Sequence, residues 1–150
     1  MRINIITLHC PANCGSVLQA YALNRYLRNE YGENVFLIDY VPPYMETEGR
    51  GLRTILRKTL FFRSYRRRTQ NFARFIQENC KLTENRYTTY EQLLENPPKA
   101  DLYITGSDQL WNPCFPCGND PAYFLQFVKD VPKIAYATSM GTDRYTREQL

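Results

Sequence analysis

The stretch Gly106-Ser-Asp-Gln-Leu-Trp-Asn112 places a carboxylate, a hydroxyl, an indole and two amides within seven residues. Side chains of these types bind hydroxyl groups and charged ligands. The mostly apolar segment Ala100–Ile104 precedes the stretch, and Pro113, Pro116 and Gly118 follow it. This order predicts a strand that ends in a functional loop.

A second group of candidate residues lies near the N-terminus. Asn13, Gly15 and Ser16 stand at the start of a segment with helical periodicity, residues 15–31. The free backbone N–H groups and the dipole at a helix start favour a phosphate or carboxylate. Asn and Ser at this position also act as simple helix caps, so an anion site and a cap remain equal alternatives.

The elements that position these residues have the pattern of a parallel α/β sheet. Strand Ile3–Leu8, helix Gly15–Tyr31 and strand Val35–Asp39 form a β-α-β unit, which predicts a right-handed crossover. A further strand, Lys133–Thr138, ends at Ser139–Gly141. In such sheets ligands bind beyond the carboxyl ends of the strands, at a switch point in the strand order. The rule selects the loops at residues 9–16, 39–43, 106–112 and 139–141.

The remaining segments predict helices and loops. Residues 52–80 favour a helix, in two pieces if it breaks near 62–65, and residues 90–95 favour a short one. Residues 122–128 fit either a short helix or a short strand. Thr146 and Gln149 resemble a capping box, so a helix begins as the chain ends. We therefore expect the chain to be a fragment of a longer protein.

Length and composition limit the classes to which the protein can belong. A chain of 150 residues suits one domain that buries a core without needing disulfides or metal. It has no apolar run of about 18 residues and no signal-peptide pattern at its start, which predicts a cytoplasmic protein. Its five cysteines are then expected to be reduced thiols.

The positive charge is concentrated in one segment. Arg50–Arg74 holds nine Arg or Lys residues and no acidic residue, which leaves a net charge of −5 on the rest of a chain whose total is +4. An anionic polymer, a nucleic acid or the inner face of a membrane would match such a segment. We favour the alternative of a solvated helix face in a basic insertion at about residues 50–80, and we expect no nucleic-acid partner.

Two further sets of residues have chemical alternatives. His9 is the only histidine and follows the first strand, where a side chain that exchanges protons near neutral pH would be useful; a structural role is favoured. Cys10 with Cys14 and Cys114 with Cys117 could converge on Zn²⁺ or an iron–sulfur cluster. The first spacing is loose and the pairs are far apart, so unligated thiols and no metal are predicted.

Five blocks stand out along the chain: Asn13–Leu23, Leu37–Tyr40 with Pro42, Gly106–Pro113, Tyr123–Leu125 and Ile134–Gly141. In residue types, order and spacing they resemble the polysaccharide pyruvyl transferase family. The family often has Tyr where Cys14 stands, and the other loop cysteines lie outside its usual pattern. The resemblance implies a Rossmann-like, mostly parallel α/β sheet flanked by helices, forming the N-terminal half of a glycosyltransferase-B-like two-domain architecture. The C-terminal domain would be an intramolecular partner.

The resemblance also implies a reaction. Characterised members transfer the enolpyruvyl carbons of phosphoenolpyruvate to two sugar hydroxyls, giving a pyruvate ketal, in exopolysaccharide biosynthesis for the bacterial cell surface. No cofactor is expected. Asp108 is the candidate base or hydroxyl-orienting group, although an Asp after Gly-Ser can simply cap the next turn. The candidate substrate-binding residues are Asn13, Gly15, Ser16, Gln19, Gly106, Ser107, Gln109, Trp111, Asn112, Ser139 and Gly141.

Several of these residues also have structural alternatives. Trp111 could stack on a sugar or anchor the core, and Gln19, Gln109 and Asn112 could bind hydroxyls or brace two loops. The expected acceptor is a saccharide or its lipid- or nucleotide-linked precursor. A fragment of this kind is expected to be inactive alone. The alternatives are a non-catalytic carbohydrate- or nucleotide-binding module and a nucleotide-sugar glycosyltransferase.

Overall fold

The computed structural model describes residues 1–10, 13–45 and 62–143. Its centre is a five-stranded sheet in the order β3-β2-β1-β4-β5, and every neighbouring pair is parallel. The strands are β1 (Ile3–Ile6), β2 (Val35–Tyr40), β3 (Leu82–Tyr87), β4 (Leu102–Asp108) and β5 (Lys133–Thr138). The predicted parallel α/β sheet is therefore confirmed.

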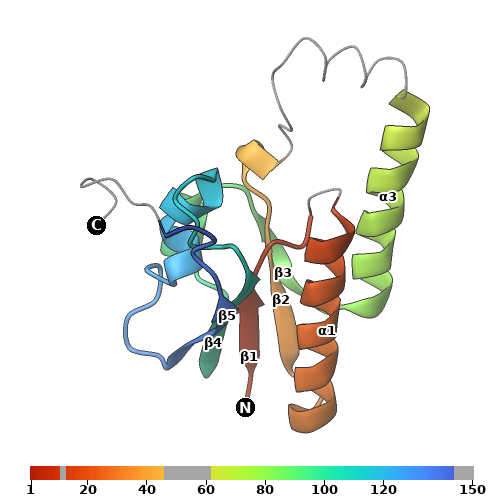
Figure 1. Cartoon of the computed structure of the whole chain (residues 1–150). Helices are drawn as coiled ribbons and strands as arrows, with labels where there is room; N and C mark the ends of the chain where they lie inside the picture. The colour runs from red at the N-terminus through yellow and green to blue at the C-terminus, as the bar shows by residue number, and fades with distance from the viewer. Residues whose placement is uncertain (11–12, 46–61, 144–150) are drawn as a thin grey trace.

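Two long helices cover one face of the sheet (Figure 1). Helix α1 (Cys14–Tyr31) and helix α3 (Phe62–Asn79) lie side by side, with Tyr21 and Phe75 in edge-to-face ring contact at 5.2 Å. The first turns of α3 project beyond α1, past the carboxyl ends of the strands (Figure 1). Helix α3 therefore forms a wall above β2 and β3 as well as a layer on the sheet.

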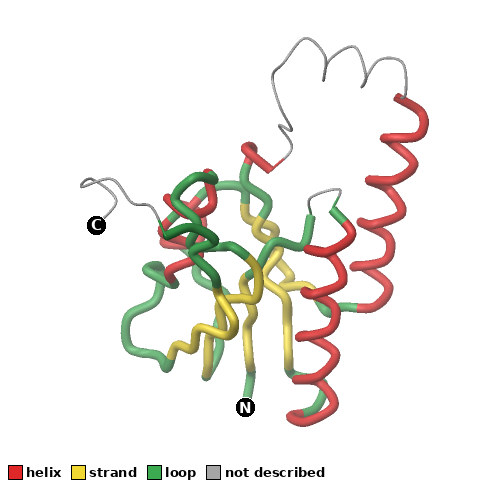
Figure 2. Tube along the Cα trace, viewed as in Figure 1, coloured by secondary structure: helices red, strands yellow, loops and turns green. Residues whose placement is uncertain are grey.

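The other face carries shorter elements. These are helix α4 (Tyr90–Glu95) and the 3₁₀ helices η2 (Pro116–Asn119) and η3 (Pro121–Phe124), while η1 (Pro43–Met45) follows β2 (Figure 2). The connections from β1 to β2 and from β2 to β3 advance toward one edge of the sheet, whereas those from β3 to β4 and from β4 to β5 advance toward the other edge. Because parallel crossovers are right-handed, the two sets of connections lie on opposite faces. The core is accordingly split into one apolar cluster on each face.

Helix α1 has clear boundary signals. Asn13 is its N-cap and accepts a hydrogen bond from the Gly15 N–H, and Gly32 ends it at a positive φ of 83°. Its buried face carries Val17, Ala20, Leu23, Asn24 and Leu27, whereas Leu18 is half exposed. The helix predicted at residues 15–31 is confirmed to within one residue.

Some predicted bounds were wrong. Strand β3 was not predicted, because its sequence, LTENRY, buries only Thr83 and Tyr87 and lacks an apolar run. Strand β4 continues through Gly106 to Asp108, since β5 pairs with it as far as Asp108↔Thr138. Of the helix predicted at 52–80, residues 62–79 are helical and residues 52–61 lie outside the described part.

The remaining predicted bounds were partly met. The short helix at residues 90–95 and the strand at 133–138 are confirmed, and the first strand ends at Ile6 rather than Leu8. The ambiguous segment 122–128 starts in a 3₁₀ helix and continues as a turn. The helix predicted from Thr146 lies outside the described residues.

Candidate functional site

A pocket opens where the strand order reverses, between the carboxyl ends of β1 and β4. Its volume is about 360 Å³, within the range of small-molecule sites. The loop after β1 and the start of α1 contribute Leu8, Asn13 and Ser16, and the end of β4 contributes Asp108 and Gln109. Two of the predicted loops, 9–16 and 106–112, thus meet at the switch point of the sheet.

Asp108 is held in a fixed orientation at the edge of this pocket. Its Oδ2 accepts a 2.8 Å hydrogen bond from the Ser16 hydroxyl, and its Oδ1 accepts one of 2.8 Å from the Gln109 backbone N–H. The backbone of Asp108 has a φ of 102°, which is unfavourable for a residue other than glycine and is typical of functional sites. Asp108 therefore both caps its own turn and presents a carboxylate to the pocket.

Gln19 connects the loops around the pocket. Its Nε2 donates to Thr7 Oγ1 at 2.8 Å and to the Ser16 carbonyl at 2.9 Å. Its Oε1 accepts a 2.9 Å hydrogen bond from the Ser107 hydroxyl, and Thr7 Oγ1 donates to the Ser107 carbonyl at 2.8 Å. The amide of Gln19 is occupied by these bonds, so it braces the loops rather than facing the pocket.

Two glycines permit close backbone packing near the site. A Cβ at Gly106, whose φ is 120°, would lie 2.0 Å from the Tyr136 carbonyl oxygen on β5. A Cβ at Gly141, whose φ is 64°, would lie 2.5 Å from Gln109 Oε1 and 2.6 Å from Asn112 Nδ2. Both glycines have spatial roles that a side chain would prevent.

The segment after β5 is tied to the Asp108 turn. The Ser139 N–H donates to the Asp108 carbonyl at 2.9 Å, and the Ser139 carbonyl accepts from the Trp111 N–H at 3.2 Å. Ser139 Oγ accepts a 3.0 Å bond from the Gly141 N–H. The predicted loop at residues 139–141 therefore supports the β4 loop, and neither Ser139 nor Gly141 lines the pocket.

Trp111 and Asn112 are engaged inside the loop itself. The Trp111 ring stacks on Phe124 at 5.5 Å and 6°, and its Nε1–H donates to the Tyr123 carbonyl at 3.1 Å. Asn112 is buried, donates from Nδ2 to Gln109 Oε1 at 2.9 Å and accepts at Oδ1 from the Cys114 N–H at 3.0 Å. These contacts agree with a structural role for each residue: Trp111 packs as an anchor and Asn112 braces the loop.

A buried carboxylate that the sequence analysis missed supports the far wall of the pocket. Asp120 Oδ2 accepts hydrogen bonds from the hydroxyls of Tyr40 (2.6 Å) and Tyr44 (2.5 Å), and its Oδ1 accepts from the Ala122 N–H. Burial, followed by the contact with Asp120, raises the pKa of both phenols far above their ordinary value. Tyr44 therefore lines the pocket as a neutral phenol. The only local sequence signal at this carboxylate is that Asp120 precedes Pro121, a pair that is typical of a helix start and does not indicate contacts with Tyr40 and Tyr44.

His9 and the cysteines do not form one site. His9 is buried beside Asp39, outside the switch-point pocket, with Nε2 3.4 Å from Asp39 Oδ1. Cys10 contacts Met45 at 3.0 Å between the sulfurs, Cys14 and Cys114 are exposed, and Cys117 is buried. Among the described residues, no group of three or more His, Cys, Asp or Glu side chains could hold a metal ion.

The helices in the described part of the chain are all too short or too polar to cross a membrane.

A parallel α/β sheet with a pocket at its switch point has the arrangement in which open α/β domains commonly bind small molecules. The particular family follows from comparison with known proteins: the family model for polysaccharide pyruvyl transferase matches residues 13–150. The chain belongs to this family. Searches of curated proteins and of solved structures gave no match.

Proposed function

We propose that this domain is the N-terminal part of an enzyme that transfers the enolpyruvyl group of phosphoenolpyruvate to a saccharide. Family membership supports a pyruvyl transferase-like function. The observation that supports a catalytic role is the Asp108 carboxylate, fixed by Ser16 at 2.8 Å at the mouth of the switch-point pocket. The proposed acceptor is a saccharide or its lipid- or nucleotide-linked precursor.

The reaction requires one base and one acid. A sugar hydroxyl attacks the central carbon of the enol, the methylene carbon takes up a proton to become a methyl group, and the hydroxyl loses its proton. The C–O bond to phosphate then breaks, and the second hydroxyl closes the ketal as its proton passes to the departing phosphate. In our proposal Asp108 accepts the proton of the attacking hydroxyl, and Ser16 keeps its carboxylate oriented.

The start of α1 is the proposed contact for the donor. Asn13 and Ser16 line the same pocket as Asp108, and the first turn of α1 contains no acidic residue. The positive end of an 18-residue helix favours a phosphate or carboxylate, and phosphoenolpyruvate carries both. Donor and acceptor would then meet above β1 and β4.

In this proposal a second domain of a glycosyltransferase-B-like architecture completes the cleft and supplies further cationic groups for the leaving phosphate. Stabilisation of leaving phosphate by positive groups or N–H donors is a large part of such catalysis. We therefore expect the 150 residues alone to be inactive. Consumption of phosphoenolpyruvate by this chain alone, with a saccharide present, would contradict that expectation.

The test is phosphate release from phosphoenolpyruvate that depends on an added saccharide, measured on a polypeptide that contains this chain and a second domain. Asp108→Asn is expected to lower the rate by about 10²- to 10⁴-fold, the usual contribution of a positioned base. The matched control is Asp130→Asn, an exposed carboxylate outside the pocket, which should leave the rate unchanged. Full activity of the Asp108→Asn protein would refute the assignment.

A further inference from the structure

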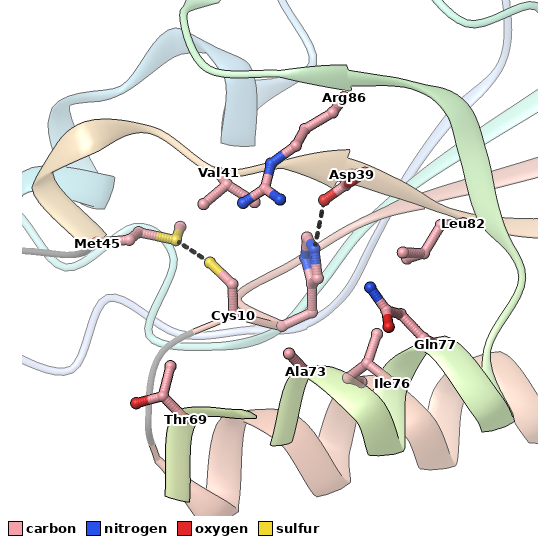
Figure 3. Close-up of a pocket in the computed structure, with 11 residues that line it drawn as sticks. Cys10, Asp39, Val41, Met45, Thr69, Ala73, Ile76, Gln77, Leu82 and Arg86 are labelled. Atoms are coloured by element: carbon pink, nitrogen blue, oxygen red, sulfur yellow. Dashed lines mark hydrogen bonds and ion pairs between the residues drawn. The ribbon is translucent and has the colours of Figure 1, made fainter. Parts of the chain in front are cut away.

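A second pocket lies under α3, above the carboxyl ends of β2 and β3 (Figure 3). Its volume is about 300 Å³, at the lower end of the range for small-molecule sites. The strand side presents Asp39 and Arg86, and α3 presents one face, with Thr69, Ala73 and Gln77 at helical spacing. Asp108 does not line it; this pocket adjoins the switch-point pocket at Met45, which lines both.

The two charged residues that line the second pocket, Asp39 and Arg86, do not form an ion pair with each other. Asp39 and Arg86 are paired in register on adjacent parallel strands, so their side chains lie on the same face of the sheet. In the part of the chain that the structure describes, no ion pair or hydrogen bond joins them. The Arg86 side chain instead extends from β3 over the pocket (Figure 3). Its guanidinium is therefore available to an anion.

The carboxylate is held in place by a buried histidine that also lines the pocket. The side chain of His9 is only 3% exposed, and its Nε2 lies 3.4 Å from Asp39 Oδ1. Its Nδ1 lies 3.2 Å from the Thr7 carbonyl oxygen, so the ring is held on both sides. Both residues line the cavity, but Asp39 is 17% exposed and is the more accessible group, so His9 is assigned the role of a positioning residue.

The rest of the pocket suits a small polar ring. Ile76 and Leu82 form an apolar wall, and Gln77 on α3 adds an amide that can both donate and accept hydrogen bonds. A carboxylate accepts hydrogen bonds from two neighbouring hydroxyls, and a guanidinium donates in pairs to phosphate or carboxylate. Together they match a molecule that carries a diol at one end and an anion at the other.

We propose that this pocket binds a phosphorylated sugar, with Asp39 accepting hydrogen bonds from adjacent hydroxyls and Arg86 donating to the phosphate. Both a free sugar phosphate and the ribose phosphate of a nucleotide have this chemistry. This proposal does not depend on the pyruvyl transfer proposed above, because its ligand contacts are Asp39 and Arg86 and its test measures binding rather than turnover.

The test is isothermal titration calorimetry of the chain with glucose 6-phosphate and with uridine 5′-monophosphate. Glucose and inorganic phosphate are titrated as half-ligands that lack the anion or the diol. Arg86→Gln and Asp39→Asn are expected to weaken binding of the preferred phosphorylated ligand by about tenfold or more each. Arg25→Gln and Asp130→Asn, exposed charges outside the pocket, are the matched controls and should stay within about twofold.

Tighter binding of glucose 6-phosphate would identify a sugar phosphate site, and tighter binding of uridine 5′-monophosphate would identify a nucleotide site. The proposal is overturned if neither ligand saturates by about 10 mM, or if inorganic phosphate binds as tightly as both. It is also overturned if Arg86→Gln leaves the affinity unchanged. Arg86 is exposed, so this variant remains informative even if the more enclosed Asp39 variant fails to fold.

Discussion

Replacing Asn24 by Leu is expected to stabilise the domain. Asn24 lies on the buried face of α1 with 0% exposure, and both its Nδ2 and its Oδ1 lack a hydrogen-bond partner. An unsatisfied buried polar group costs about 1–3 kcal/mol. Leucine has the same branching at Cγ and a larger side chain, is apolar like its neighbours Ala20 and Leu27, and has a higher helix propensity by a few tenths of a kcal/mol, so the change removes the cost without creating a cavity.

The expected gain is about 1–3 kcal/mol in the free energy of unfolding, which corresponds to a rise in Tm of roughly 2–12 °C for a chain of this size. Urea denaturation followed by circular dichroism measures the first quantity, and a thermal scan measures the second. Asn29→Leu is the matched control because Asn29 lies in the same helix but is exposed. It changes helix propensity alone and should shift stability by less than about 0.7 kcal/mol.

A loss of stability in the Asn24→Leu protein, or a gain no larger than that of Asn29→Leu, would refute the reasoning. Either result would mean that the amide of Asn24 has a partner in solution, such as a bound water, or that the larger leucine overpacks the contact between α1 and the sheet.

Three further predictions follow from the packing, thiol chemistry and charge of the domain. Gly106→Ala should destabilise it by more than about 1 kcal/mol, measured by urea denaturation, because the new Cβ would lie 2.0 Å from a carbonyl oxygen on β5 at a φ of 120°; an unchanged midpoint would contradict the close approach. Burial raises the pKa of the Cys80 thiol to about 11, so in a thiol-labelling assay at pH 8 Cys80 should react far more slowly than exposed Cys114, and equal rates would contradict its burial. The same shift means that Cys80 contributes stability below its unfolded pKa and that this contribution is lost as the pH rises from about 9 to about 11. The last prediction concerns the exposed residues Arg66, Arg67 and Arg68 of α3. If the basic segment contacts membranes, replacing all three by Gln should weaken sedimentation with anionic vesicles at low salt by about tenfold or more, with neutral vesicles as the control. Unchanged binding would support the alternative of a solvated helix face.

The elements with a regular local pattern could be predicted from the sequence. Helix α1 has a cap at Asn13, apolar residues at helical spacing and a terminal Gly32, and all of these act within a few residues. Strand β3 could not be predicted, because it is an edge strand with only Thr83 and Tyr87 buried. Its strand conformation depends on pairing with β2, which the local sequence does not encode.

The candidate site could be predicted as loops but not as contacts. The rule that ligands bind at the carboxyl ends of parallel strands selected the loops that contain Ser16 and Asp108. Their 2.8 Å hydrogen bond joins residues 92 positions apart, and no local pattern specifies such a pair. The contacts of Asp120 with Tyr40 and Tyr44 could not be predicted for the same reason, because the residues are 80 and 76 positions apart in the sequence.

Met45 lines both pockets, so its side chain is in a position to link them. Its unbranched side chain adopts several rotamers at low cost, and its sulfur now lies 3.0 Å from that of Cys10. A molecule that displaces Met45 from one pocket changes the space available in the other. Occupancy of the two sites would then be coupled in both directions, with the same factor for each ligand. One methionine would thus let a phosphorylated sugar under α3 tune the affinity of the pocket beside Asp108.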